Sequence, residues 1–143
     1  MSSSYDSLTH SRWDCKYHIV FIPICRKKQL YGNTRKFLGP VFRELSKQKE
    51  CHIIEGKMMI DHVHMLIQIP PKYAVSSVIG FIKGKSAIAV ARQFYRRKRN
   101  FAGEQLWARG YAVSTVGFEL EKIKQYIKHQ EILDNKQEEE GNI

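Results

Sequence analysis

The sequence predicts an α+β protein with a ferredoxin-like (βαββαβ) fold, a four-stranded antiparallel sheet with helices on one face. Short segments with alternating apolar residues and longer segments with helical spacing follow one another in the order β-α-β-β-α-β. An amphipathic segment at residues 118–134 predicts one further, C-terminal helix. The length suits a single domain over residues 1–143, with an ordered core at about 12–133.

The first three predicted elements are a strand, a helix and a strand. Residues 14–24 (DCKYHIVFIPI) are rich in β-branched and aromatic side chains, as is typical of strands. Residues 33–50 carry apolar side chains at helical spacing, although Pro40 lies among them. Residues 51–60 (CHIIEGKMMI) again favour a strand.

The next three predicted elements are a strand, a helix and a strand again. Residues 62–70 (HVHMLIQIP) predict the third strand, and Asp61 before it indicates a tight hairpin or a bulge. Residues 74–95 have the spacing of a long helix. Residues 106–117 are aromatic and β-branched, and they predict the fourth strand.

The bulk composition favours a protein that binds a polyanion. Lys and Arg total 24 against 14 acidic residues, and basic runs lie at 25–29 and 95–100. Cys15, Cys25 and Cys51 form no CxxC pair, so we expect reduced cysteines rather than disulfides or a zinc site.

Both ends of the chain are polar. Residues 1–12 predict a mobile lead-in without the features of a signal peptide, and residues 134–143 predict a mobile acidic tail. No apolar run approaches the roughly 20 residues that span a bilayer. We therefore expect a soluble, cytoplasmic protein with no membrane partner.

Two histidines lie one residue apart in the third predicted strand. Side chains alternate across a strand, so His62 and His64 share one face with Leu66 and Gln68. The opposite, apolar face consists of Val63, Met65, Ile67 and Ile69. Imidazole is the commonest metal-binding side chain, so the pair is a candidate metal site, although two ordinary histidines of a sheet would give the same pattern.

The last predicted helix offers a candidate nucleophile. Tyr126 and Gln130 share a face, with Lys122 one turn earlier and His129 beside them. For this helix taken by itself, a packing tyrosine and a surface amide are the simpler interpretation. Together with two histidines, however, an amide oxygen could hold a divalent cation that polarises a phosphodiester, while the tyrosine hydroxyl attacks phosphorus. Covalent attachment conserves the phosphodiester energy, which suits strand transfer.

Three motifs give the chain a resemblance to a known family. DHVHMLI (61–67), LWARGYAVSTVG (106–117) and YIKHQ (126–130) occur in this order, and KYHIVFIPICRKK (16–28) precedes them. In these residues the chain resembles the single-tyrosine HUH transposases, the TnpA-type enzymes of small bacterial insertion sequences that move as single-stranded DNA. The resemblance covers about residues 12–133.

The resemblance implies a set of roles. His62, His64 and Gln130 would bind Mg²⁺ or Mn²⁺, with His129 as a further candidate ligand, and Tyr126 would form a 5′-phosphotyrosine and free a 3′-hydroxyl. It also implies a homodimer with composite active sites, single-stranded DNA with hairpin ends as the partner, and no small-molecule cofactor. The candidate DNA contacts are the basic residues Arg26, Lys27, Lys28, Lys83, Lys85, Arg96, Arg97, Lys98, Arg99 and Lys122.

Two other functions fit part of the pattern. A domesticated or replication/relaxase-type HUH endonuclease would share the active site and differ only in its substrate. A non-enzymatic ferredoxin-like module that binds nucleic acid would instead expose aromatic side chains on its central strands, where the third predicted strand carries histidines.

Overall fold

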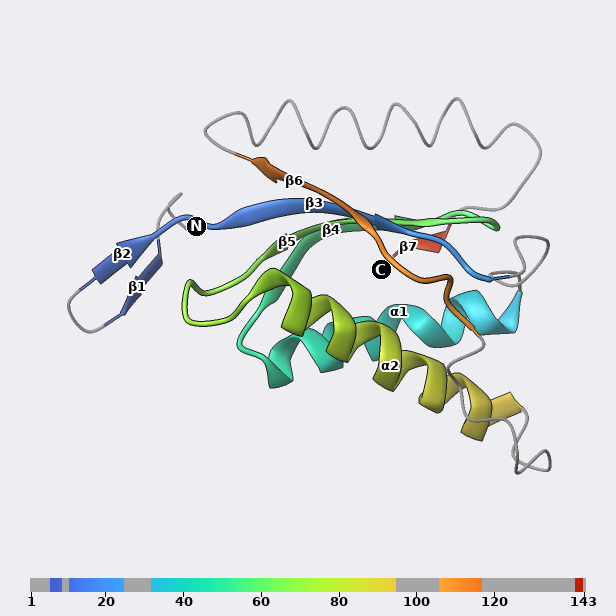
Figure 1. The fold of residues 1–143 in the computed structure, drawn as a ribbon. Coiled ribbons are helices and arrows are strands. Elements are labelled where there is room, and N and C mark those ends of the chain that lie inside the picture. The colour runs from blue at the N-terminus through green and yellow to red at the C-terminus, as the bar shows by residue number, and fades with distance from the viewer. Residues whose placement is uncertain (1–5, 9–10, 25–31, 95–105, 117–140, 143) are drawn as a thin grey trace.

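The element order of the chain agrees with the predicted βαββαβ arrangement (Figure 1). The computed structural model describes residues 6–8, 11–24, 32–94, 106–116 and 141–142. In this order along the chain, the six main elements are β3 (Lys16–Phe21), α1 (Asn33–Gln48), β4 (His52–Met58), β5 (Val63–Gln68), α2 (Val75–Phe94) and β6 (Ala112–Val116). The predicted C-terminal helix at residues 118–134 lies outside the described residues.

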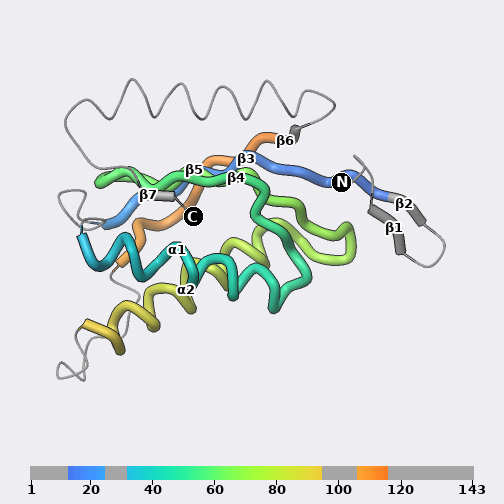
Figure 2. The backbone as a smooth tube through the Cα atoms, turned by 180° about the vertical axis from the view of Figure 1, so that it is seen from behind, coloured from blue at the N-terminus to red at the C-terminus, as the bar shows by residue number. Residues whose placement is uncertain are grey.

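The main strands form an antiparallel sheet in the order β6-β3-β5-β4. The first and third of them along the chain, β3 and β5, therefore lie in the centre, as the ferredoxin-like connectivity requires. Both α1 and α2 cover the same face of the sheet in the two views (Figures 1 and 2). Neither of these two helices, which are those of the described ranges, is long and apolar enough to cross a membrane.

Three short strands lie outside the predicted set. β1 (Asp6–Leu8) and β2 (Ser11–Trp13) pair as an antiparallel hairpin, and β7 (Gly141–Asn142) pairs with the edge of β4. The structure thus has short strands near both ends of the chain, where the sequence predicted only a mobile lead-in and tail. Backbone hydrogen bonds between strands need no apolar side chains, so polar composition did not reveal them.

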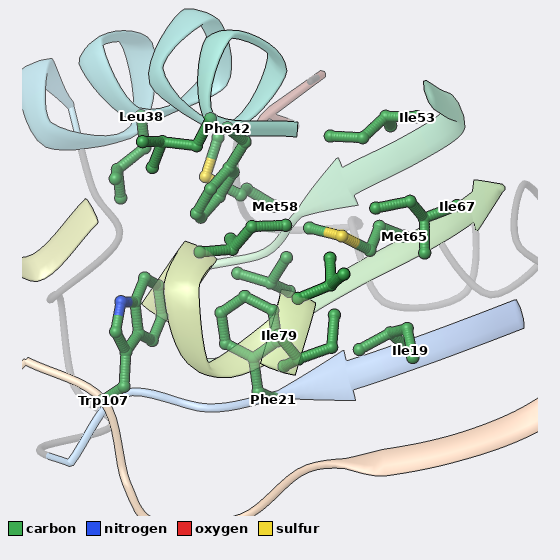
Figure 3. Close-up of a cluster of buried hydrophobic side chains, with 14 of the residues drawn as sticks. Ile19, Phe21, Leu38, Phe42, Ile53, Met58, Met65, Ile67, Ile79 and Trp107 are labelled. Atoms are coloured by element: carbon green, nitrogen blue, oxygen red, sulfur yellow. The ribbon is translucent and has the colours of Figure 1, made fainter. Parts of the chain in front are cut away.

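The core lies between the helices and the sheet (Figure 3). Ile19 and Met65 project from the two central strands and are fully buried. Phe21 packs edge-on against Phe42 of α1 and against Trp107, with ring centroids 6.0 and 4.8 Å away. The apolar alternation along β3 and β5 thus supplies one complete wall of the core.

The fourth strand is shorter than predicted, because β6 begins at Ala112 rather than at residue 106. Trp107 forms only an isolated bridge with Pro23. The Trp107 side chain is buried, and its Nε1–H donates to the hydroxyl of Ser86 at 2.9 Å. Gly110, with a φ of 83°, separates this core-anchored segment from the strand.

Candidate functional site

A tight hairpin between β4 and β5 positions the two sequence-predicted histidines. The N–H of Met59 donates to the carbonyl of His62 at 2.8 Å, so Ile60 and Asp61 form the tip of the turn. His62 directly precedes β5, and His64 is the second residue of that strand. Their ring centroids are 4.6 Å apart. The structure therefore brings the two imidazoles side by side.

Strand β3 adds a third imidazole to this cluster. In the register of β3 with β5, Val20 lies opposite His64, and His18 lies opposite Leu66. Residues opposite each other in an antiparallel pair point to the same face, so His18 and His64 share the face away from the helices. Nε2 of His18 lies 3.4 Å from Nδ1 of His64, and the ring centroids are 5.4 Å apart.

A carboxylate contacts the first histidine of the pair. Nδ1 of His62 lies 2.6 Å from Oδ1 of Asp61. The Asp61 side chain is 51% exposed and that of His62 is 18% exposed, so the pair lies at the rim of the histidine cluster. A hydrogen-bond acceptor on Nδ1 holds a proton there and makes Nε2 the nitrogen that can bind a metal ion.

The environment favours uncharged imidazoles at the centre of the cluster. Burial is the main cause that lowers the pKa of His64 to about 4; the neighbouring His62 and His18 act in the same direction, and Asp61 opposes them. Burial also lowers the pKa of His18. A neutral imidazole retains the lone pair that a metal ion requires, so the local electrostatics suit metal binding.

Nε2 of His62 and Nε2 of His64 are the candidate donor atoms for a metal ion. In each ring the other nitrogen, Nδ1, faces a partner: Asp61 for His62 and His18 for His64. Within the described ranges, no three His, Cys, Asp or Glu side chains are placed to share one ion. The described residues therefore offer two candidate ligands, His62 and His64, and not a complete metal site.

The histidine-bearing face of the sheet is less open than its alternation suggested. Leu66, two residues after His64, is fully buried although it lies outside the main core cluster. By register, the described strands place no Phe, Tyr or Trp on this face. The aromatic stacking platform of a ferredoxin-like RNA-binding module is thus absent from these strands.

Most of the other predicted site residues lie outside the described part of the chain. They are Tyr126, Gln130, His129, Lys122, Arg26, Lys27, Lys28, Arg96, Arg97, Lys98 and Arg99. Their predicted roles stay predictions.

The two remaining predicted DNA contacts, Lys83 and Lys85, have different surroundings on α2. Lys85 is exposed. Lys83 is half-buried, and its ammonium donates to the carbonyls of Ala108 and Gly110 at 2.8 and 2.7 Å. Burial lowers the pKa of Lys83. Lys83 therefore fastens α2 to the segment that precedes β6.

His18 and Asp61 contact the two histidines, and neither is among the site residues predicted from the sequence. The signal for His18 is its position in the alternation of β3, where Tyr17, Ile19 and Phe21 point to the core and His18 points away. A ferredoxin-like order pairs the first and third strands, so a polar residue on that face of β3 must approach the histidine strand.

Comparison with known sequences identifies a family over most of the chain. A family model described as "Transposase IS200 like" matches residues 11–130. The transposase for insertion sequence element IS200 of Salmonella typhimurium is 47% identical over 124 residues, which are 87% of this chain and 82% of that protein. The ISDra2 transposase TnpA of Deinococcus radiodurans is 27% identical over 119 residues, 82% of this chain and 85% of that protein.

Solved structures share the fold. A crystal structure of a candidate transposase from Deinococcus radiodurans R1 superposes with a TM-score of 0.69 at 24% identity, over 87% of this chain and 97% of that one. A REP-associated tyrosine transposase bound to a REP hairpin superposes with a TM-score of 0.62 at 14% identity, over 85% of this chain and 68% of that one.

Proposed function

The chain belongs to the family of IS200-like transposases, and from this premise we propose that it cuts and rejoins single-stranded DNA through a covalent bond to Tyr126. The observation that carries the proposal is the pair of adjacent imidazoles, His62 and His64, whose ring centroids are 4.6 Å apart and whose Nδ1 atoms each face a partner. This arrangement supports a site that binds a divalent cation beside a phosphodiester.

In the proposed reaction, the hydroxyl of Tyr126 loses its proton, and its oxygen attacks phosphorus and forms a new P–O bond. The bond between phosphorus and the 3′ oxygen breaks, and that oxygen takes up a proton. One DNA end is then joined to Tyr126 through its 5′ phosphate, and the other ends in a 3′-hydroxyl. Attack by a 3′-hydroxyl on the phosphotyrosine reverses these changes and joins two DNA ends.

His62, His64 and Gln130 are the proposed ligands of Mg²⁺ or Mn²⁺. When bound, the ion supplies positive charge that polarises the phosphodiester and offsets the charge that develops on its oxygens. The two histidines hold fixed positions because the central strand β5 and the adjoining hairpin carry them. Such preorganised ligands need little rearrangement when an ion binds.

Hairpin ends of single-stranded DNA are the proposed substrate. The net charge of +10 supports a polyanionic partner, and a structural relative was solved with a REP hairpin bound. We further propose a homodimer in which Tyr126 of one protomer completes the histidine site of the other.

The nucleophile is tested with Tyr126→Phe on a labelled DNA hairpin. The variant should form no covalent protein–DNA adduct on a denaturing gel, because a phenylalanine ring cannot attack phosphorus. Tyr111→Phe is the matched control, since Tyr111 packs against the core, and it should form the adduct normally. Unchanged cleavage by Tyr126→Phe would exclude this mechanism.

Metal dependence and subunit sharing need separate experiments. Treatment with a chelator should stop cleavage, and added Mg²⁺ or Mn²⁺ should restore it; undiminished cleavage in the chelator would exclude a metal role. Mixing His64→Ala with Tyr126→Phe should restore activity if the tyrosine acts across the dimer, because one composite site is then intact. If the tyrosine acts within its own protomer, the mixture will be inactive.

A further inference from the structure

His18 lies beside His64, one of the proposed metal ligands. It occupies the centre of β3, directly beside the histidine strand β5, and projects from the same face as His64. Both strands are internal to the sheet, with a hydrogen-bonded neighbour on each side. The spacing between the two imidazoles is thus set by backbone pairing rather than by a flexible loop.

The contact between the two rings restricts the nitrogen atoms that can carry the protons. Two neutral imidazoles form a hydrogen bond only if one nitrogen donates and the other accepts. If Nε2 of His64 offers its lone pair to a metal ion, Nδ1 of the same ring must carry the proton. Nδ1–H of His64 then donates to Nε2 of His18, 3.4 Å away, and His18 carries its own proton on Nδ1.

We propose that His18 is a positioning residue that fixes the tautomer and the ring orientation of His64. Asp61 has the corresponding position beside His62, where its carboxylate meets Nδ1 at 2.6 Å. Nε2 of His18 approaches Nδ1 of His64. It does not approach Nε2 of His64, which is the proposed ligand atom. His18 therefore supports a ligand and is not one itself. This inference rests on the proposed metal-binding function.

Removal of the acceptor should weaken metal binding without disturbing the core. His18 lies on the face away from the helices, so His18→Leu leaves the apolar wall of β3 unchanged. The variant leaves Nδ1–H of the half-buried His64 without its acceptor, and the other tautomer becomes accessible. Loss of such a supporting partner typically lowers metal affinity about 10- to 100-fold.

The matched variants separate a positioning role from a structural one. In His18→Gln, the amide oxygen can reach the place of Nε2 and accept the same hydrogen bond. His52→Leu is the control, because His52 is an exposed histidine on β4 of the same sheet. Circular dichroism would verify that all three variants fold.

The first readout needs no metal. Long-range ¹H–¹⁵N spectra of the metal-free protein report the tautomer of each of its six histidines, and a His64→Ala spectrum assigns the signals. We expect His64 protonated on Nδ1 in the unmodified protein, a mixture of tautomers in His18→Leu, and recovery in His18→Gln. A His64 protonated on Nε2, or a tautomer unaffected by His18→Leu, would overturn the proposal.

The second readout is the dissociation constant for Mn²⁺, measured by calorimetry. His18→Leu should raise Kd about 10- to 100-fold, while His18→Gln and His52→Leu should remain within about threefold. Equal Kd values for His18→Leu and the unmodified protein would refute the positioning role. If the unmodified protein binds no Mn²⁺ yet shows the expected tautomers, the metal proposal fails and the His18–His64 contact stands.

Discussion

Replacing Lys83 with methionine should destabilise the protein without removing a contact to DNA. Its ammonium donates to two backbone carbonyls, those of Ala108 and Gly110, and it lies 5.9 Å from the ring centroid of Phe21. Methionine keeps most of the apolar stem of the side chain but cannot donate. The substitution therefore removes two hydrogen bonds between α2 and the segment before β6, while the bond from Trp107 to Ser86 remains.

The expected magnitude follows from the surroundings of the two bonds. A partly buried hydrogen bond from a charged group contributes about 1.5 kcal/mol or more, whereas an exposed one contributes about 0.5 kcal/mol. Because the bond to Ala108 is partly buried and that to Gly110 is exposed, we expect a loss of about 2 kcal/mol. In a domain of this size, that corresponds to a fall in Tm of about 6 °C.

Urea denaturation and DNA binding at several salt concentrations measure the two properties separately. Lys85→Met is the matched control, since Lys85 is exposed on the same helix, and its unfolding free energy should change by less than about 0.5 kcal/mol. For Lys83→Met, the slope of log K against log salt should equal that of the unmodified protein. Loss of one phosphate contact on a single strand would reduce that slope by about 0.7. Unchanged stability together with a reduced slope would refute this interpretation of Lys83.

Further predictions concern the core and a thiol. Trp107→Phe and Ser86→Ala each break the hydrogen bond from the indole to the Ser86 hydroxyl, and each should lower the free energy of unfolding in urea by about 1–3 kcal/mol. The double variant should lose no more than the more destabilised single variant, because both substitutions remove the same bond. Fully additive losses would contradict a shared bond. Burial raises the pKa of the Cys51 thiol to about 11, so mass spectrometry at pH 8 should find Cys51 unmodified by iodoacetamide until urea unfolds the chain, because little thiolate is present. Ile19→Ala should lower the free energy of unfolding by about 3 kcal/mol, because Ile19 is fully buried. Val113 lies in register with Ile19 but is 48% exposed, so Val113→Ala should change the free energy of unfolding by less than about 0.5 kcal/mol. Equal losses would contradict the placement of β6 at the exposed edge.

The fold was predictable because its signals are local. Alternation in 62–70 and helical spacing in 33–50 are properties of neighbouring residues, and they survive as β5 and α1. The start of β6 was not predictable in this way. Residues 106–111 have a strand-like composition, but Trp107 is buried in the core and the positive φ of Gly110 interrupts the extended backbone.

The site was only partly predictable for a related reason. His62 and His64 could be predicted because their spacing is visible in the sequence itself. His18 is 46 residues from His64 along the chain and meets it only through strand pairing. For Lys83, a predicted DNA contact, composition could not show that its ammonium donates to backbone carbonyls, because those carbonyls lie 25 and 27 residues away along the chain.

The two-sided construction of β5 has a practical consequence. Val63, Met65 and Ile67 belong to the core, while His64 projects from the other side of the same strand. Substitutions of His64 should therefore leave the packing between sheet and helices intact, and catalytically inactive variants at this position should keep the native fold. Such versions could be crystallised with uncut DNA, which would capture the encounter that precedes cleavage.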